Sequence, residues 1–143
     1  MYRKNLDLQL EIARRSEGAG AVFNVTFNNP KSLAPCYVDA GYSNVKIQVT
    51  SGDENIWNSQ VCKAGAQSKT LLLGPGVSSR QGYLWNGIHA GSDCTGTALA
   101  QAGTYRVSLS VNEKTVVENL PFIINQNRTI SIPAAPAQPE SAQ

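Results

Sequence analysis

Apolar and polar residues alternate with a period of two through much of the chain. Every second position between residues 5 and 13 is leucine or isoleucine, and residues 21–28 and 104–111 repeat the alternation. A strand with one buried and one solvated face produces this pattern. Less regular segments of the same character predict further strands at 36–38, 45–49, 55–59, 69–73, 80–85, 115–124 and 128–132.

Turn-forming residues separate these segments, and no segment has a convincing helical pattern. Clusters of Ser, Gly, Asn, Asp or Pro that favour tight turns lie at 16–20, 51–54, 74–76 and 112–114. We therefore expect an all-β chain, an antiparallel β-sandwich of immunoglobulin-like type with about eight strands. It should span residues 5–132, between an N-terminal stub at 1–4 and a disordered Pro/Ala-rich tail at 133–143.

Composition narrows the class of protein. Hydrophobic residues make up 41% of the chain and charged residues 15%, so a core can form although charges are sparse. The net charge is only +2, and no more than two basic residues are adjacent, which argues against nucleic acid as a partner. No apolar run approaches the roughly 20 residues of a membrane span, so we expect no direct membrane insertion by this segment.

Three cysteines bear on both the fold and the compartment. Cys62 and Cys94 each follow a Trp-bearing strand, and a disulfide between them would join the two loops beyond those strands. It would also pin segment 86–102, which has no other anchor recognisable in the sequence. Spacing does not determine connectivity, so pairing of Cys36 with either of the others stays open. The favoured Cys62–Cys94 pair leaves Cys36 as a free thiol and points to an exported protein.

Several residues are expected to serve the framework. Tryptophan in a strand usually packs a core, with an exposed stacking platform as the alternative. A Gly-Thr-Tyr sequence opening a late strand is typical of a tyrosine corner, in which the tyrosine hydroxyl bonds nearby backbone. The positions assigned structural roles are Trp57, Trp85, Pro75, Gly76, Gly103 and Tyr105.

No catalytic constellation is recognisable. His89, the only histidine, could complete a zinc site with the three cysteines, but zinc sites usually contain close cysteine pairs. It could also activate Cys36 as a nucleophile, although no orienting third group is evident. We therefore expect neither an enzyme, nor a metal site, nor a cofactor.

The motifs W-x-S, L-x-P-G, W-x-G and G-T-Y-x-V occur in this order. The order resembles the immunoglobulin-like domain of bacterial intracellular proteinase inhibitors, over about residues 5–125. The matching residues are Trp57, Ser59, Leu73, Pro75, Gly76, Trp85, Gly87, Gly103, Thr104, Tyr105 and Val107. With the segment Cys36-x-x-Asp39-x-Gly41 and the other two cysteines, the chain resembles more closely uncharacterised actinobacterial domains anchored outside the cell by one membrane helix. This resemblance implies an immunoglobulin-like fold and an extracytoplasmic location.

We therefore expect a non-enzymatic binding or accessory domain of the bacterial cell envelope, the soluble part of a membrane-anchored protein. Its partner would be a protein or cell-wall material. Loops held by a rigid framework commonly bind, so the candidate surface is formed by segments 57–65 and 86–102. The candidate contacts there are Asn58, Gln60, Asn86, His89 and Asp93. Capture of a partner strand by a sheet edge is an alternative binding mode. A proteinase inhibitor acting through an exposed loop, and a thiol-dependent enzyme, are the alternative functions.

Overall fold

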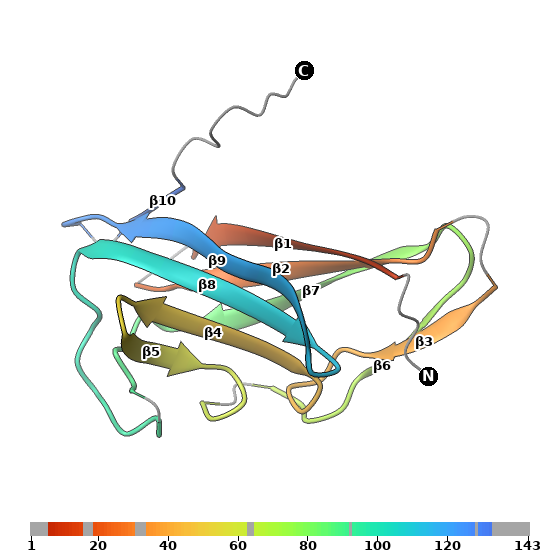
Figure 1. Ribbon diagram of the computed structural model, residues 1–143, viewed down its shortest axis with the longest axis horizontal. Helices are drawn as coiled ribbons and strands as arrows, with labels where there is room; N and C mark the ends of the chain where they lie inside the picture. Colours follow the sequence, from red (N-terminus) through yellow and green to blue (C-terminus); the bar gives the residue numbers. More distant parts are fainter. Residues whose placement is uncertain are drawn as a thin grey trace, which may run out of the picture.

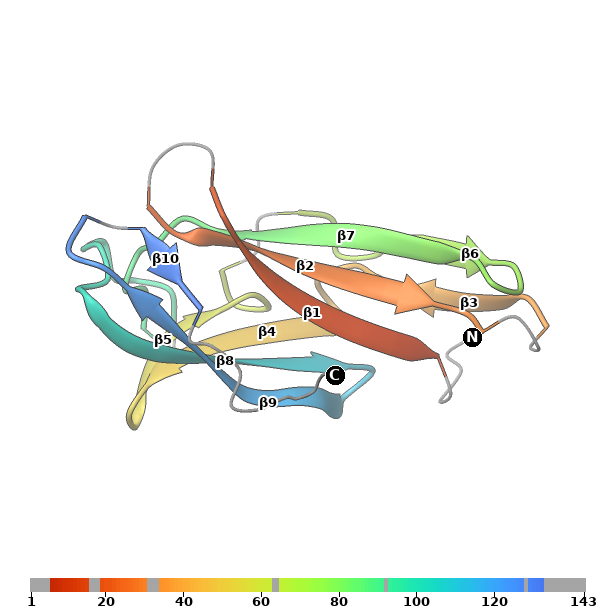
Figure 2. The same ribbon diagram turned by 90° about the horizontal axis from the view of Figure 1, so that it is seen from above.

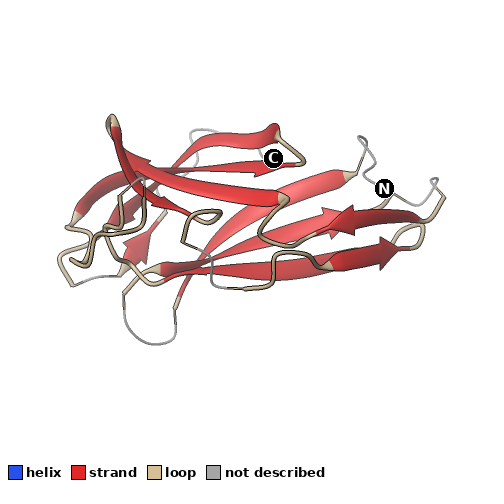
Figure 3. Ribbon diagram, turned by 90° about the horizontal axis from the view of Figure 1, so that it is seen from below, coloured by secondary structure: helices blue, strands red, loops and turns tan. Residues whose placement is uncertain are grey.

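The computed structural model describes residues 6–15, 19–30, 34–62, 65–91, 93–127 and 129–132. These residues form strands but no helix, and so none that could cross a membrane; the all-β expectation is confirmed (Figure 3). The ten strands are β1 (Asp7–Arg14), β2 (Ala21–Asn28), β3 (Cys36–Asp39), β4 (Val45–Ser51), β5 (Glu54–Asn58), β6 (Thr70–Leu73), β7 (Ser78–Trp85), β8 (Gly103–Val111), β9 (Lys114–Ile124) and β10 (Ile130–Ser131). The predicted stub at 1–4 and tail at 133–143 lie outside the described residues.

The strands form three antiparallel sheets with the orders β1-β2-β7, β10-β9-β8-β4-β5 and β3-β6. Figures 1 and 2 show the first two sheets as layers that face each other, with the β3–β6 ribbon extending one end of the long axis. Strand β2 is central in its sheet and pairs with β7 from Ala21 opposite Trp85 to Asn28 opposite Ser78. Strands distant in sequence are thereby brought side by side.

The core fills the space between the two layers. Buried and half-buried residues alternate strictly along β2, as its sequence predicts for a strand with one inward face. An aromatic cluster joins the layers, and its neighbouring ring centroids lie 5.7 to 6.5 Å apart. The cluster consists of Phe23, Trp57, Trp85, Tyr105 and Phe122. Both tryptophans are therefore core residues rather than exposed platforms.

A β-bulge interrupts the alternation in β5. Val49 pairs with Trp57 and Thr50 pairs with Asn55, so Ile56 is an extra residue without a partner in β4. The two consecutive residues Ile56 and Trp57 are consequently both buried, a departure from period two that bulges permit. Strand β5 also lies at the edge of its sheet, where the Ile56 carbonyl accepts hydrogen bonds from elsewhere in the chain.

The W-x-S and W-x-G motifs are explained by close local contacts. The Ser59 hydroxyl is buried, accepts the Ile47 N–H at 2.8 Å and donates to the Val45 carbonyl at 3.4 Å. Gly87 has a φ of 84°, and a Cβ there would lie 2.7 Å from the Gly20 nitrogen. Only glycine combines that conformation with so close an approach of two backbone segments.

The Pro75–Gly76 pair forms the turn between β6 and β7. The Val77 N–H donates to the Gly74 carbonyl at 3.0 Å, and Gly76 has a φ of 77°, as position i+2 of a type II turn requires. The turn docks on Asn29, whose carbonyl accepts the Gly76 N–H at 2.6 Å. Asn29 is buried, and the sequence had marked it only as part of a break between strands.

Tyr105 makes the contact expected of a tyrosine corner. Its hydroxyl donates to the Gln101 carbonyl, four residues upstream, at 2.6 Å. Gly103 lies between them with a φ of 156°, a region that residues with a Cβ seldom adopt.

Strands β8 and β9 meet in a two-residue turn. Asn112 and Glu113 have φ values of 54° and 67°, which defines a type I′ hairpin turn. Asparagine tolerates this left-handed conformation, whereas glutamate adopts it at a cost.

The β3–β6 ribbon lies at the end of the molecule opposite the start of β5 (Figure 1). Its inner face contributes the buried Cys36 side chain to the core. On its outer face Tyr37 pairs with Leu72, and both are exposed. The ribbon is tied to β7 by the buried Tyr83, whose hydroxyl donates to the Ala40 carbonyl at 2.6 Å. Burial, reinforced by the nearby Tyr42 and Asp39, raises the pKa of Tyr83 far above its ordinary value.

Candidate binding site

Cys62 and Cys94 form a disulfide, so the favoured pairing is confirmed and the two alternatives are wrong. Their Cα atoms lie 5.5 Å apart, across a sequence separation of 32. Cys36 is a free, buried thiol. Because the disulfide consumes two of the cysteines, they cannot join His89 as zinc ligands. Elsewhere in the described part of the chain, no group of three potential ligand side chains is arranged to hold a metal ion.

Segment 86–102 is anchored by its backbone as well as by the disulfide, which corrects the expectation from the sequence. The Ile56 carbonyl, on the edge strand β5, accepts the N–H groups of Ala90 at 2.8 Å and Gly91 at 3.1 Å. Further backbone pairs close the segment on itself: His89 N–H to Ala98 O, Ala100 N–H to Gly87 O, Gly96 N–H to Ala90 O, and a bridge between Ile88 and Leu99. We call residues 86–91 and 93–102 the lobe.

The lobe is tightly closed and joined to the start of β5. A Cβ on Gly96 would lie 2.1 Å from the His89 carbonyl oxygen, so no side chain fits there. His89 Nε2 lies 3.1 Å from the Glu54 carboxylate. An exposed pair of this kind contributes little energy, and the backbone bonds therefore do most to fix the lobe.

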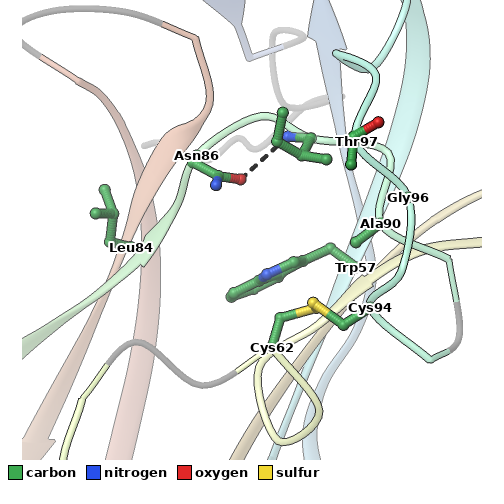
Figure 4. Close-up of a pocket in the computed structure, with 9 residues that line it drawn as sticks. Trp57, Cys62, Leu84, Asn86, Ala90, Cys94, Gly96 and Thr97 are labelled. Atoms are coloured by element: carbon green, nitrogen blue, oxygen red, sulfur yellow. Dashed lines mark hydrogen bonds between the residues drawn. A yellow bond between two sulfur atoms is a disulfide. The ribbon is translucent and has the colours of Figure 1, made fainter.

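A pocket of about 460 Å³ opens between the lobe, the disulfide and the end of β7 (Figure 4). Trp57 and the disulfide lie on one side of it, and Asn86 and Thr97 lie on the other. None of its nine lining residues is charged: Trp57, Cys62, Leu84, Asn86, Ile88, Ala90, Cys94, Gly96 and Thr97. Its volume falls within the roughly 300–1,000 Å³ of typical ligand sites.

Five polar residues were expected from the sequence to contact a partner, and of these only Asn86 lines the pocket. The Asn58 side-chain oxygen accepts the Gln60 N–H at 2.9 Å, and the Gln60 side chain donates to the Ser43 carbonyl at 3.2 Å. Both side chains therefore support the turn that leads to the disulfide.

The other two nominated residues also make local contacts. His89 pairs with Glu54, as described above. The Asp93 carboxylate accepts the Thr95 hydroxyl at 2.8 Å and the Thr95 N–H at 3.3 Å. The Thr95 hydroxyl, followed by its N–H, holds the pKa of the exposed Asp93 carboxyl below its ordinary value. Asp93 thus stabilises the turn that carries Cys94.

Asn86 both supports its own turn and faces the pocket. Its side-chain oxygen accepts the Ile88 N–H at 3.2 Å, which fixes the orientation of the amide. In Figure 4 the amide nitrogen lies on the side of the Trp57 indole, whereas the Thr97 hydroxyl points away from it. No hydrogen-bond partner of Asn86 Nδ2 lies among the described residues, so this amide gives the pocket a directed donor.

Most of the uncharged lining was not singled out by the sequence. Leu84, Ala90 and Gly96, together with the polar Thr97, come together only after β7 pairs with β2 and the lobe folds onto Ile56. The turn-stabilising role of the polar residues could have been recognised from the sequence, because Asn and Asp side chains in loops commonly hydrogen-bond the backbone two residues ahead.

A thiol–imidazole pair is not formed, since Cys36 lies in β3 and His89 contacts Glu54 at the start of β5, at the other end of the molecule (Figure 1). No protein-family model and no curated protein matches the chain. Function is therefore inferred from the geometry of the pocket.

Proposed function

We propose that the chain is a non-enzymatic binding domain of the bacterial cell envelope that acts outside the cytoplasm as the soluble part of a membrane-anchored protein. We propose further that its two facing sheets are an immunoglobulin-like sandwich. The tyrosine corner at Tyr105 and the core pair Trp57 and Trp85 support this assignment. The Cys62–Cys94 disulfide supports the compartment, because structural disulfides persist in oxidising surroundings.

The observation that carries the binding proposal is the uncharged pocket beside the disulfide. Its walls come from three separate parts of the chain, and the disulfide and the Ile56 hydrogen bonds hold two of them in place. A pocket fixed in this way needs little ordering when a partner binds, which favours affinity. The bonds that fold the lobe back onto β5 favour this pocket over a protruding inhibitory loop as the binding surface.

Site-specific photo-cross-linking in the cells that naturally express the protein tests the proposal. A benzophenone amino acid replaces Thr97, which is exposed beside the pocket, and the matched control replaces Leu72, which is 62% exposed on the β3–β6 ribbon. We expect a discrete adduct from position 97 and none from position 72. Equal adducts at both positions, an adduct at 72 alone, or none at either would contradict binding through the pocket.

A further inference from the structure

The chemistry of the pocket restricts what it can bind. We infer that it takes an uncharged apolar side chain, together with a neighbouring carbonyl, from an extended segment of a protein partner. This inference rests on the proposed binding function and specifies its ligand class.

Charge complementarity gives the first restriction. None of the nine lining residues is charged, and the pocket offers no counter-ion to a charged group. The nearest ionisable groups of the lobe are already engaged, His89 with Glu54 and Asp93 with Thr95. Burying an unpaired charge is costly, so a carboxylate or ammonium group is a poor occupant.

Asn86 gives the second restriction. Its side-chain oxygen is bonded to the Ile88 N–H, so the group it presents to a ligand is the Nδ2 donor. Asn86 is exposed in the free protein, so a ligand that covers Nδ2 must offer it an acceptor, and a carbonyl oxygen supplies one without charge. An apolar group beside a carbonyl is the arrangement found in every apolar residue of a peptide.

The walls fit a saccharide poorly, although cell-wall glycan is the other partner expected for an envelope domain. Sugar binding would draw on an exposed aromatic face, and Trp57 is only 3% exposed because its indole packs in the aromatic cluster. Asn86, Thr97 and the indole N–H of Trp57 supply the only polar side-chain groups in the lining, too few to satisfy several hydroxyl groups.

Exposed apolar residues adjoin the lining residues along the chain and across the Ile88–Leu99 bridge. Leu84 in its wall is 39% exposed. Val61 precedes Cys62 and is 45% exposed, and Leu99, the bridge partner of Ile88, is 42% exposed. Exposed apolar side chains that adjoin the lining of a pocket favour an interaction surface there. They extend the contact past one side chain, as an extended peptide segment requires.

Amide and methyl NMR titration of the full chain tests the inference with small probes. N-acetyl-L-phenylalanine amide carries an apolar side chain and neutral carbonyls. N-acetyl-L-phenylalanine adds a carboxylate, and N-acetylglucosamine represents glycan. Asn86→Asp keeps the acceptor for the Ile88 N–H but removes the donor. Asn58→Asp is the matched control, because Asn58 makes the same kind of turn bond to Gln60 outside the pocket.

We expect the neutral amide to shift the resonances of Leu84, Ile88 and Thr97 and to leave Leu72 unchanged. Asn86→Asp should weaken this binding at least about fivefold, the value of one hydrogen bond, whereas Asn58→Asp should not. Preference for the charged or the sugar probe, equal effects of both variants, or no shift with any probe would overturn the inferred ligand class. The proposed binding function would then still stand or fall by the cross-linking result.

Discussion

Removal of the Cys62–Cys94 disulfide should lower the free energy of unfolding by about 4 kcal/mol. A cross-link over a separation of 32 restricts the unfolded chain, and the loop-entropy relation gives roughly 3.7 kcal/mol for a loop of that size at 25 °C. For a domain of this length the corresponding fall in Tm is about 10–15 °C. The double variant Cys62→Ala/Cys94→Ala should still fold, because the backbone bonds of the lobe to Ile56 remain.

Urea unfolding followed by tryptophan fluorescence at pH 6, where thiolate exchange is slow, measures this loss. Reduced wild-type protein is the control and should match the double variant. The far-ultraviolet circular dichroism of the folded variant should be unchanged. A loss below about 1 kcal/mol would refute the reasoning, since it would mean that the bond does not restrict the unfolded chain as the loop length requires.

Three further predictions concern the framework. Glu113→Gly should stabilise the protein by about 0.5–1 kcal/mol, because glycine adopts the left-handed conformation of the type I′ turn without steric strain. A lower free energy of unfolding in urea would contradict this. Gly87→Ala should cost more than about 2 kcal/mol, because its Cβ would meet backbone. The control Gly52→Ala has open space around it and should cost only about 1 kcal/mol, so equal losses would refute the steric argument. Burial raises the pKa of Tyr83, so as the pH rises this side chain ionises in the unfolded state before it ionises in the folded state. Stability should be unaffected by this group below pH 10 and should fall by about 1.4 kcal/mol per pH unit above it. Tyr83→Phe should remove that slope between pH 10 and 11.5, and an unchanged slope would contradict the assignment.

The strands could be predicted where packing follows the pleat. Residues 21–28 alternate because β2 has one face in the core, and the structure places the strand at the same residues. The pairing of β2 with β7 could not be predicted, because it joins residues 50 to 64 positions apart in the sequence and depends on how the whole core packs. The bulge at Ile56 could not be predicted either, since a bulge changes which face of the sheet a residue occupies without changing the local composition.

The sequence predicted which segments form the candidate site better than it predicted the residues that line it. The disulfide could be favoured because both cysteines follow tryptophan strands, and segments 57–65 and 86–102 do meet at the pocket. The anchoring of the lobe was missed because backbone donors have no sequence signature. Most nominated polar residues support turns, and the apolar lining residue Leu84 looked like an ordinary strand residue.

The Cys62–Cys94 disulfide closes one side of the proposed site. The central claim is therefore that this disulfide is present in the protein isolated from the cell that naturally produces it. Intact mass after thiol alkylation, with and without prior reduction, measures it on protein purified from that cell in denaturant. We predict one alkylated thiol without reduction, at Cys36, and three after reduction. Three alkylated thiols without reduction would contradict both the closed pocket and the extracytoplasmic assignment.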